Sequence, residues 1–230
     1  MKKLVSLLIA MIMVLSAVAY ADMAVPSKTT TDNTVVEKIE TSTGVVVEET
    51  FDIVVTPDPE PVVKEITKLY QYVLEEQKAP ISYFPEETKT KVLEVLAVKL
   101  AGVEKVEDIE DITAIENLPD LETMEINEFV TIDTFDYKEA YGDIKTSFAF
   151  VTEYQVEQQV VVLVGLYSGE IDENGEFVVE WIVLDATVEE DGSLSVVIPQ
   201  EEMLKIQDAQ SVAMAVLSEK LEDDAKALAE

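Results

Sequence analysis

An unbroken apolar run of five residues, Val160-Val-Val-Leu-Val164, lies in the second half of the sequence. A strand with one exposed face alternates apolar and polar side chains, whereas an unbroken run is typical of a strand covered on both faces. The run therefore indicates a folded, β-rich module in which one face of this strand meets a core. Its other face needs a second apolar layer to cover it.

Short turn signals separate this run from its neighbours. Asn174-Gly175 and Asp191-Gly192 stand between apolar runs, and such pairs favour β-hairpins because their residues tolerate positive φ. The runs at 160–164, 177–184 and 194–198 therefore predict an antiparallel meander. The segments 145–151 and 212–217 add two further strands to the prediction.

Two helices are predicted before these strands. Apolar residues recur at three- and four-residue intervals between 62 and 74, and again between 92 and 100. Pro85 and the two glutamates after it mark the start of the second helix, and Gly102 marks its end. The two form a helical hairpin, whose apolar sides are available to cover the run at 160–164.

These patterns predict an α+β fold in which an N-terminal helical hairpin region packs with a C-terminal antiparallel β-sandwich. A short helix is expected after Pro199, just before the final strand, and this feature makes an immunoglobulin-like sandwich the expectation. A two-layer sandwich alone is the alternative. The expected division is a signal peptide at 1–21, an extended segment with candidate strands at 22–60, a helical region at 61–122, the sandwich at 123–218 and a polar tail at 219–230. Whether 22–60 joins the sheet stays open.

The first 21 residues have the pattern of a secretory signal peptide. Lys2 and Lys3 precede an apolar run, and Ala19-Tyr-Ala21 fits the small-x-small cleavage site. An uncleaved anchor is the alternative, but a membrane span needs roughly 20 apolar residues and this run is shorter. We expect the mature chain to begin at Asp22. It is expected to be secreted, extracellular or in the cell envelope, without membrane insertion after cleavage.

The sequence contains no histidine, cysteine or arginine, and its 16 basic residues are all lysines. This composition excludes Ser-His and Cys-His nucleophile pairs, the usual zinc and copper sites, and bidentate arginine clamps. No catalytic or phosphate-binding motif occurs either. We therefore expect a protein that is not an enzyme and uses no cofactor or metal. The net charge of −32 repels nucleic acid, which we exclude as a partner.

Aromatic residues near the tip of the predicted helical hairpin form the candidate recognition surface. Tyr70 and Tyr72 cannot share one helix face, so one of them is expected to be exposed. The candidate residues are Tyr72, Tyr83 and Phe84. Trp181, the only tryptophan, is expected in the core.

Carboxylate chemistry is the alternative that the composition leaves open. Two acids across a cleft can hydrolyse glycosides if burial raises the pKa of one of them. Glu180 has apolar neighbours, although a solvent-facing position is the simpler interpretation. Calcium could bind at 172–176 or 104–125, but the glycine comes too early for an EF-hand, and a solvated acidic face is simpler.

Four segments in the second half of the chain carry a resemblance to a known group. They are Val164-Gly-Leu-Tyr167, Trp181-Ile-Val-Leu-Asp-Ala186, Asp191-Gly192 and Ala215-Val-Leu-Ser218. They resemble a domain of uncharacterised secreted bacterial proteins, which implies an exported module and gives no residue a role.

The functional hypothesis is a secreted, non-catalytic binding or interaction module at or near the bacterial cell surface. Its partner is an unknown extracellular protein or glycan. The alternative hypothesis is a carboxylate-dependent extracellular glycan hydrolase.

Overall fold

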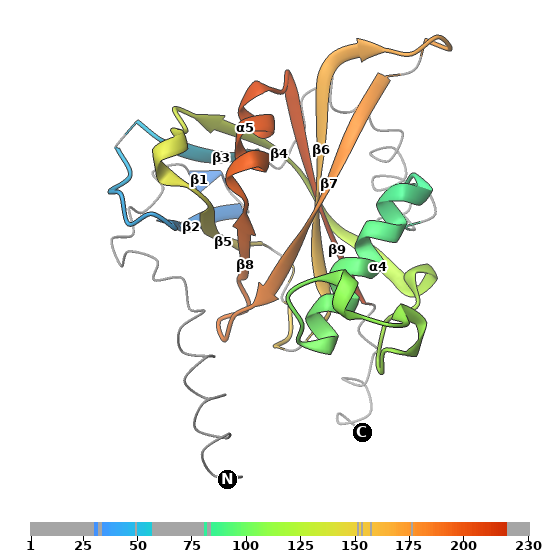
Figure 1. Ribbon diagram of the computed structural model, residues 1–230. Coiled ribbons are helices and arrows are strands. Elements are labelled where there is room, and N and C mark those ends of the chain that lie inside the picture. Colours follow the sequence, from blue (N-terminus) through green and yellow to red (C-terminus); the bar gives the residue numbers. More distant parts are fainter. Residues whose placement is uncertain are drawn as a thin grey trace, which may run out of the picture.

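The computed structural model of the chain describes residues 30–31, 34–48, 50–56, 81, 84–150, 152, 154–156, 158–175 and 177–219. Within them, nine antiparallel strands form one sheet in the order β1-β2-β5-β8-β7-β6-β9-β4-β3 (Figure 1). The strands are β1 (Thr30–Thr31), β2 (Thr34–Thr41), β3 (Asp52–Thr56), β4 (Met124–Phe135), β5 (Ile144–Ala149), β6 (Val160–Ile171), β7 (Phe177–Val188), β8 (Leu194–Ile198) and β9 (Ser211–Glu219).

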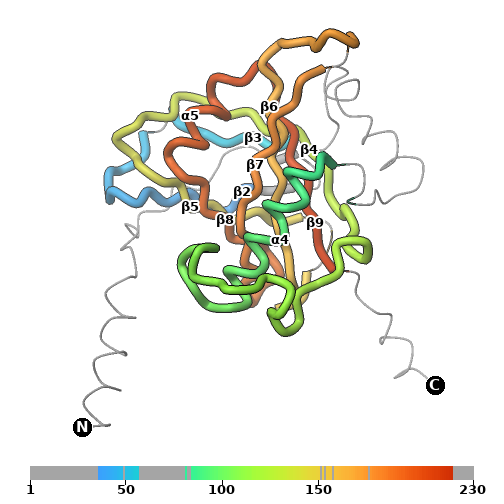
Figure 2. The backbone as a smooth tube through the Cα atoms, turned by 45° about the vertical axis from the view of Figure 1, so that its right-hand side comes forward, coloured from blue at the N-terminus to red at the C-terminus, as the bar shows by residue number. Residues whose placement is uncertain are grey.

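The sheet curls until its two ends approach each other. β2 and β3 stand near opposite ends of the strand order, yet they are close in space and lie on the same side of the molecule (Figures 1 and 2). Val36 and Ile39 of β2 share one buried core with Ile53 and Val55 of β3. The described sheet is therefore a nearly closed barrel whose interior is filled by side chains.

A second apolar core lies on the outside of the barrel, beneath helix α4 (Glu86–Ala101). Val162 of β6 points into the barrel, whereas Val161 and Leu163 point outward and pack with Val92 and Leu96 of α4. Both faces of β6 are thus covered, which is the physical reason for its unbroken apolar run. The helix covers the strand as expected, but the inner face meets the far side of the same sheet.

Helix α4 has the ends that the sequence predicts. Pro85 precedes it, Glu86 and Glu87 occupy its first turn, and Gly102 ends it with a left-handed φ of 64°. The acids lie near the positive end of the helix dipole, which favours them there. The helix predicted at 62–74 lies outside the described residues.

A second helix, α5 (Gln200–Asp208), lies where β8 diverges from β7. Its buried residues Met203 and Ile206 belong to the barrel core. The backbone N–H of Gln200 donates a hydrogen bond of 2.9 Å to Asp143 Oδ1, which holds the start of the helix. α5 therefore completes the core beside the short β7–β8 pairing, which runs only from Ala186 to Val188.

The remaining connections are short turns. The segment between α4 and β4 holds three 3-10 helices, η2 (Val106–Asp108), η3 (Ile112–Ala114) and η4 (Leu121–Thr123). A fourth, η5 (Glu139–Tyr141), precedes β5. The predicted hairpin turns at Gly175 and Gly192 both have φ of 83°, so the meander β6-β7-β8 is confirmed. No helix in the described ranges is both long enough and apolar enough to cross a membrane.

The predicted fold class, a helical hairpin region packed with a β-sandwich, is wrong. The described strands form one curled sheet, which also overturns the immunoglobulin-like topology and the sandwich-alone alternative. Turn signals specify which neighbouring strands pair, whereas pairing between distant strands decides whether a sheet splits or curls. Here the segment 22–60 supplies that pairing, because β2 joins β5 and β3 joins β4.

Candidate functional site

A polar hollow lies on the outer surface of β2 and β5, beside the turn that joins β7 to β8. Ile144, Thr146 and Phe148 of β5 are buried, so the alternate residues Lys145 and Ser147 point to the outside. Five carboxylates, two lysines and two serines line the hollow: Glu37, Lys38, Glu40, Lys145, Ser147, Glu189, Glu190, Asp191 and Ser193. The cavity that the described residues enclose in the barrel interior is small and apolar.

The charged groups of the polar hollow are not equivalent. Glu40 is only 8% exposed and forms an ion pair with Lys38 on the same strand. Lys145 stands opposite Glu40 in the β2–β5 register. Its ammonium makes no ion pair or hydrogen bond with any residue that the structure describes. Lys145 is therefore the cation of the hollow that is available to a bound molecule.

Asp191 is held by its own turn. Its Oδ1 accepts hydrogen bonds from the backbone N–H of Ser193 at 3.0 Å and from the Ser193 hydroxyl at 2.7 Å. The hydroxyl hydrogen bond, with the backbone one adding to it, lowers the pKa of the Asp191 carboxyl. A glycosidase acid needs the opposite shift, a raised pKa that keeps it protonated. This carboxylate suits recognition better than proton donation.

The structure describes one residue of the predicted aromatic surface, Phe84, and places it in a core. Phe84 is only 3% exposed, and its ring meets that of Trp181 edge to face with centroids 4.8 Å apart. Phe84 is therefore part of the outer core, because the chain entering α4 passes over β7. Tyr72 and Tyr83 lie outside the described residues. Trp181 is in a core, as predicted, but beneath α4 and not inside a sandwich.

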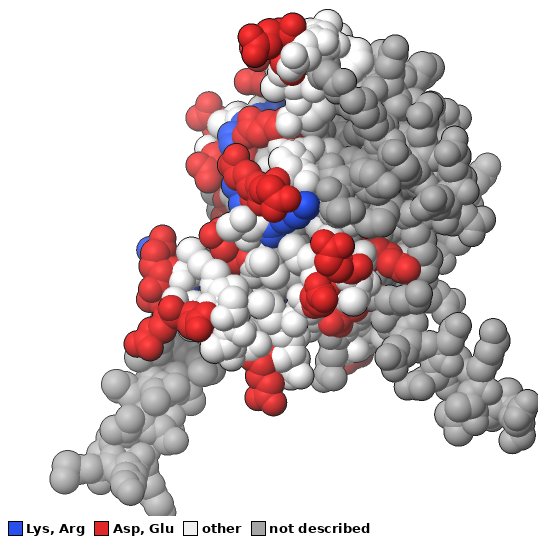
Figure 3. All heavy atoms as spheres, turned by 90° about the vertical axis from the view of Figure 1, so that its right-hand side faces the viewer, with Lys and Arg blue, Asp and Glu red and all other residues white. Residues whose placement is uncertain are grey.

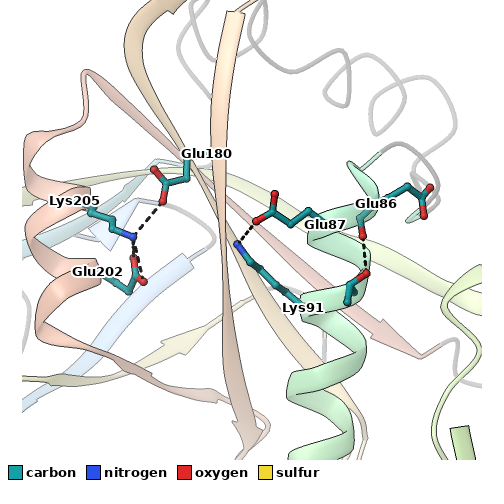
Figure 4. A network of polar contacts seen from close by, with 7 residues as sticks. Glu86, Glu87, Lys91, Glu180, Glu202 and Lys205 are labelled. Carbon is teal, nitrogen blue, oxygen red and sulfur yellow. Dashed lines mark hydrogen bonds and ion pairs between the residues drawn. The ribbon is translucent and has the colours of Figure 1, made fainter. Parts of the chain in front are cut away.

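Glu180 faces solvent, as the simpler interpretation held. Its carboxylate and that of Glu202 each lie 3.1 Å from the ammonium of Lys205 on α5 (Figure 4). Glu202 first and Glu180 second raise the pKa of Lys205 by hydrogen bonding. On the other side of β7, Glu87 pairs with Lys91 of α4 at 2.9 Å. These exposed pairs are surface features and each contributes little to stability.

The two candidate calcium segments have ordinary roles. Asp172 Oδ1 accepts the backbone N–H of Asn174 at 2.8 Å and so shapes the hairpin turn. In the part of the chain that the structure describes, acidic residues form no group of three or more that could hold a metal ion. Figure 3 shows acids in separate groups over one face, with few lysines among them.

The polar hollow was not predicted from the sequence. Alternation along β5 marks Lys145 and Ser147 as outward-facing, but only the curled sheet brings β2 and the turn at 189–193 beside them. The described strands define a nearly closed antiparallel barrel with a charged hollow on its outer surface. A scan of protein-family models finds no match to this chain, and searches of curated proteins and of solved structures find none either.

Proposed function

We propose that this protein is an exported, non-catalytic binding module that acts at or near the bacterial cell surface. Its partner is an extracellular protein or glycan that contacts the polar hollow. One observation carries the proposal. The Lys145 ammonium lies among the carboxylates of the hollow, on a strand that is paired in the sheet, and it has no ion-pair partner among the described residues.

The chemistry of the polar hollow favours hydrogen bonding. The Lys145 ammonium offers three donors, the carboxylates are acceptors, and the Ser147 hydroxyl can be either. Hydroxyl and amide groups of a glycan or a polypeptide present both donors and acceptors, so they match such a surface. The strands β2 and β5 are held in the sheet, which reduces the entropy lost on binding.

Export is supported by the sequence of residues 1–21, which lie outside the described part of the chain. Their charged start, apolar run and small-x-small site are those of a secretory signal peptide. The absence of cysteine fits a protein that depends on packing, without disulfides, for its stability.

Co-sedimentation with the native cell envelope tests the proposal. The mature protein, Lys145→Ala and the control Lys105→Ala would each be incubated with an insoluble envelope fraction, and the bound share measured across salt concentrations. Lys105 is a suitable control because it is an exposed lysine away from the hollow. We expect wild type and Lys105→Ala to bind equally and Lys145→Ala to bind at least several-fold less.

Equal binding by all three proteins would show that the polar hollow does not take part in binding to the envelope. The same samples, assayed for release of soluble sugars, test the hydrolase. Release that survives purification and stops when one particular acid is replaced would establish catalysis and overturn the proposal.

A further inference from the structure

The hairpin of β6 and β7 extends beyond the barrel as an arm, residues 168–180 (Figure 1, top). β6 pairs with β9 only as far as Tyr167, which stands opposite Ser211. β7 pairs with β8 only at Ala186 to Val188. Within the described residues, the two strands of the arm are thus paired with each other and with no third strand.

The β6 edge of the arm is protected against pairing. The register shifts between Tyr167 and Ile171, and Gly169 has φ of 95°. Gln210 donates its backbone N–H to the carbonyl oxygen of Tyr167 at 2.8 Å, at the base of this edge. A bulge of this kind twists an edge away from incoming strands.

The β7 edge, Phe177-Val-Val-Glu180, has none of these protections. It contains no proline, lysine or bulge, and two of its residues are β-branched. Its backbone groups that face away from β6 make no hydrogen bond within the described part of the chain. Val178 is 43% exposed and Ile171, near the tip, is 58% exposed. An open edge with exposed apolar residues is a template for an added strand.

The charge of the arm indicates which kind of partner can bind at the β7 edge. Its described acids are Glu170, Asp172, Glu173 and Glu180, of which Glu180 already pairs with Lys205 of α5, and residues 168–180 contain no lysine. A second copy of this chain would bring the same acids together, and each copy carries a net charge of −32. A cationic segment would find complementary charge at this edge.

The two faces of the arm differ, which specifies the pattern of that segment. Phe177 and Val179 lie on the outer face with Tyr167, whose ring meets Phe177 at 5.3 Å between centroids. Glu180 lies on the opposite face, because neighbouring residues of a strand alternate. We propose that the β7 edge binds, by strand addition, an extended segment of another protein in which apolar residues alternate with Lys or Arg. The arm is separate from the polar hollow, so this inference does not depend on the function proposed for Lys145.

Synthetic peptides test this pairing without altering the protein. The first probe is a fluorescent seven-residue peptide of alternating Val and Lys, and the second has the same sequence with a methyl group on every backbone nitrogen. The methylated peptide keeps every side chain and the charge but cannot form the ladder along either edge. A Val-Glu peptide is the charge control. Fluorescence anisotropy would measure binding to the full mature chain, and to Val179→Pro and Val179→Thr.

We expect the Val-Lys peptide to bind and the methylated and Val-Glu peptides to bind at least tenfold more weakly. Val179→Pro should also weaken binding at least tenfold, because in this register the backbone N–H of Val179 faces away from β6, whereas Val179→Thr, which keeps that N–H, should bind like wild type. Equal binding of the methylated peptide would show attraction by charge alone and overturn the proposal. The proposal would also be overturned if the Val-Lys peptide showed no binding at concentrations up to about 1 mM. Self-association of the protein that Val179→Pro abolishes would identify a second copy as the occupant, which also overturns it.

Discussion

Trp181 lies directly opposite Gly165 across the β6–β7 pair, and its ring covers the glycine. A Cβ at position 165 would stand 2.8 Å from the indole ring, closer than real Cβ atoms approach. The indole ring of Trp181 also meets the ring of Phe84 edge to face. Glycine in the middle of a buried strand thus makes room for the largest residue of the outer core.

Replacing Gly165 with valine should displace the indole. Overpacking of this kind typically costs about 1 to 3 kcal/mol. Because Trp181 is the only tryptophan, its fluorescence reports the site directly, and urea unfolding followed by fluorescence would measure the loss. Thr187→Val, on an exposed position of β7, is the control and should change neither signal. An unchanged emission spectrum and stability in Gly165→Val would contradict the packing described.

The cover that α4 provides can be tested on the helix itself. Leu96 is fully buried against the outer face of the sheet, so Leu96→Ala should lower the free energy of unfolding by about 2 to 5 kcal/mol. Lys91→Ala, on the exposed side of the same helix, should change it by less than about 1 kcal/mol. Chemical denaturation of both variants gives the comparison. Similar losses in the two would mean that α4 does not depend on this core.

Asp191 makes the stability of the β7–β8 turn depend on pH. Its pKa is lower in the folded protein than in the unfolded chain, since Ser193 donates two hydrogen bonds to the charged form. The stabilisation is therefore present above the unfolded value of about 3.9 and is lost as the pH falls through the folded pKa. Asp191→Asn should melt at a lower temperature than wild type near neutral pH, and the difference should shrink at acidic pH. A gap in melting temperature that stays constant over that range would contradict the assignment.

Local signals in the sequence predicted the local structure. Pro85 and Gly102 bound α4, Pro199 precedes α5, and glycines 175 and 192 form the hairpin turns, all as expected. Each of these signals acts through backbone geometry within a few residues, so its effect does not depend on how distant parts of the chain are arranged. The arrangement of the sheet has no such local cause.

Strand β2 shows why the curled sheet was not predicted. Its buried residues Val36 and Ile39 are three apart, because a register shift between Val36 and Lys38 breaks the alternation. A spacing of three gives no period of two, so residues 34–41 did not indicate a strand, although candidate strands were expected elsewhere within 22–60. Without β2, neither the closure against β3 nor the polar hollow could be inferred. Phe84 was misplaced for a related reason, since the outer core that buries it exists only in the assembled sheet.

Export gives the most direct test on the native protein. The signal-peptide interpretation predicts cleavage after Ala21, so the mature chain should begin at Asp22 and lack Lys2 and Lys3. Its 14 lysines against 48 acids give a net charge of −34. Intact mass spectrometry of protein from the culture medium and from the envelope would show which form is present. Ala19→Leu should block cleavage, because the site needs small residues, and should leave the longer form in the membrane fraction. The control Ala10→Leu, within the apolar run, should leave cleavage unchanged. A native protein that retains residues 1–21 would favour the uncleaved anchor instead.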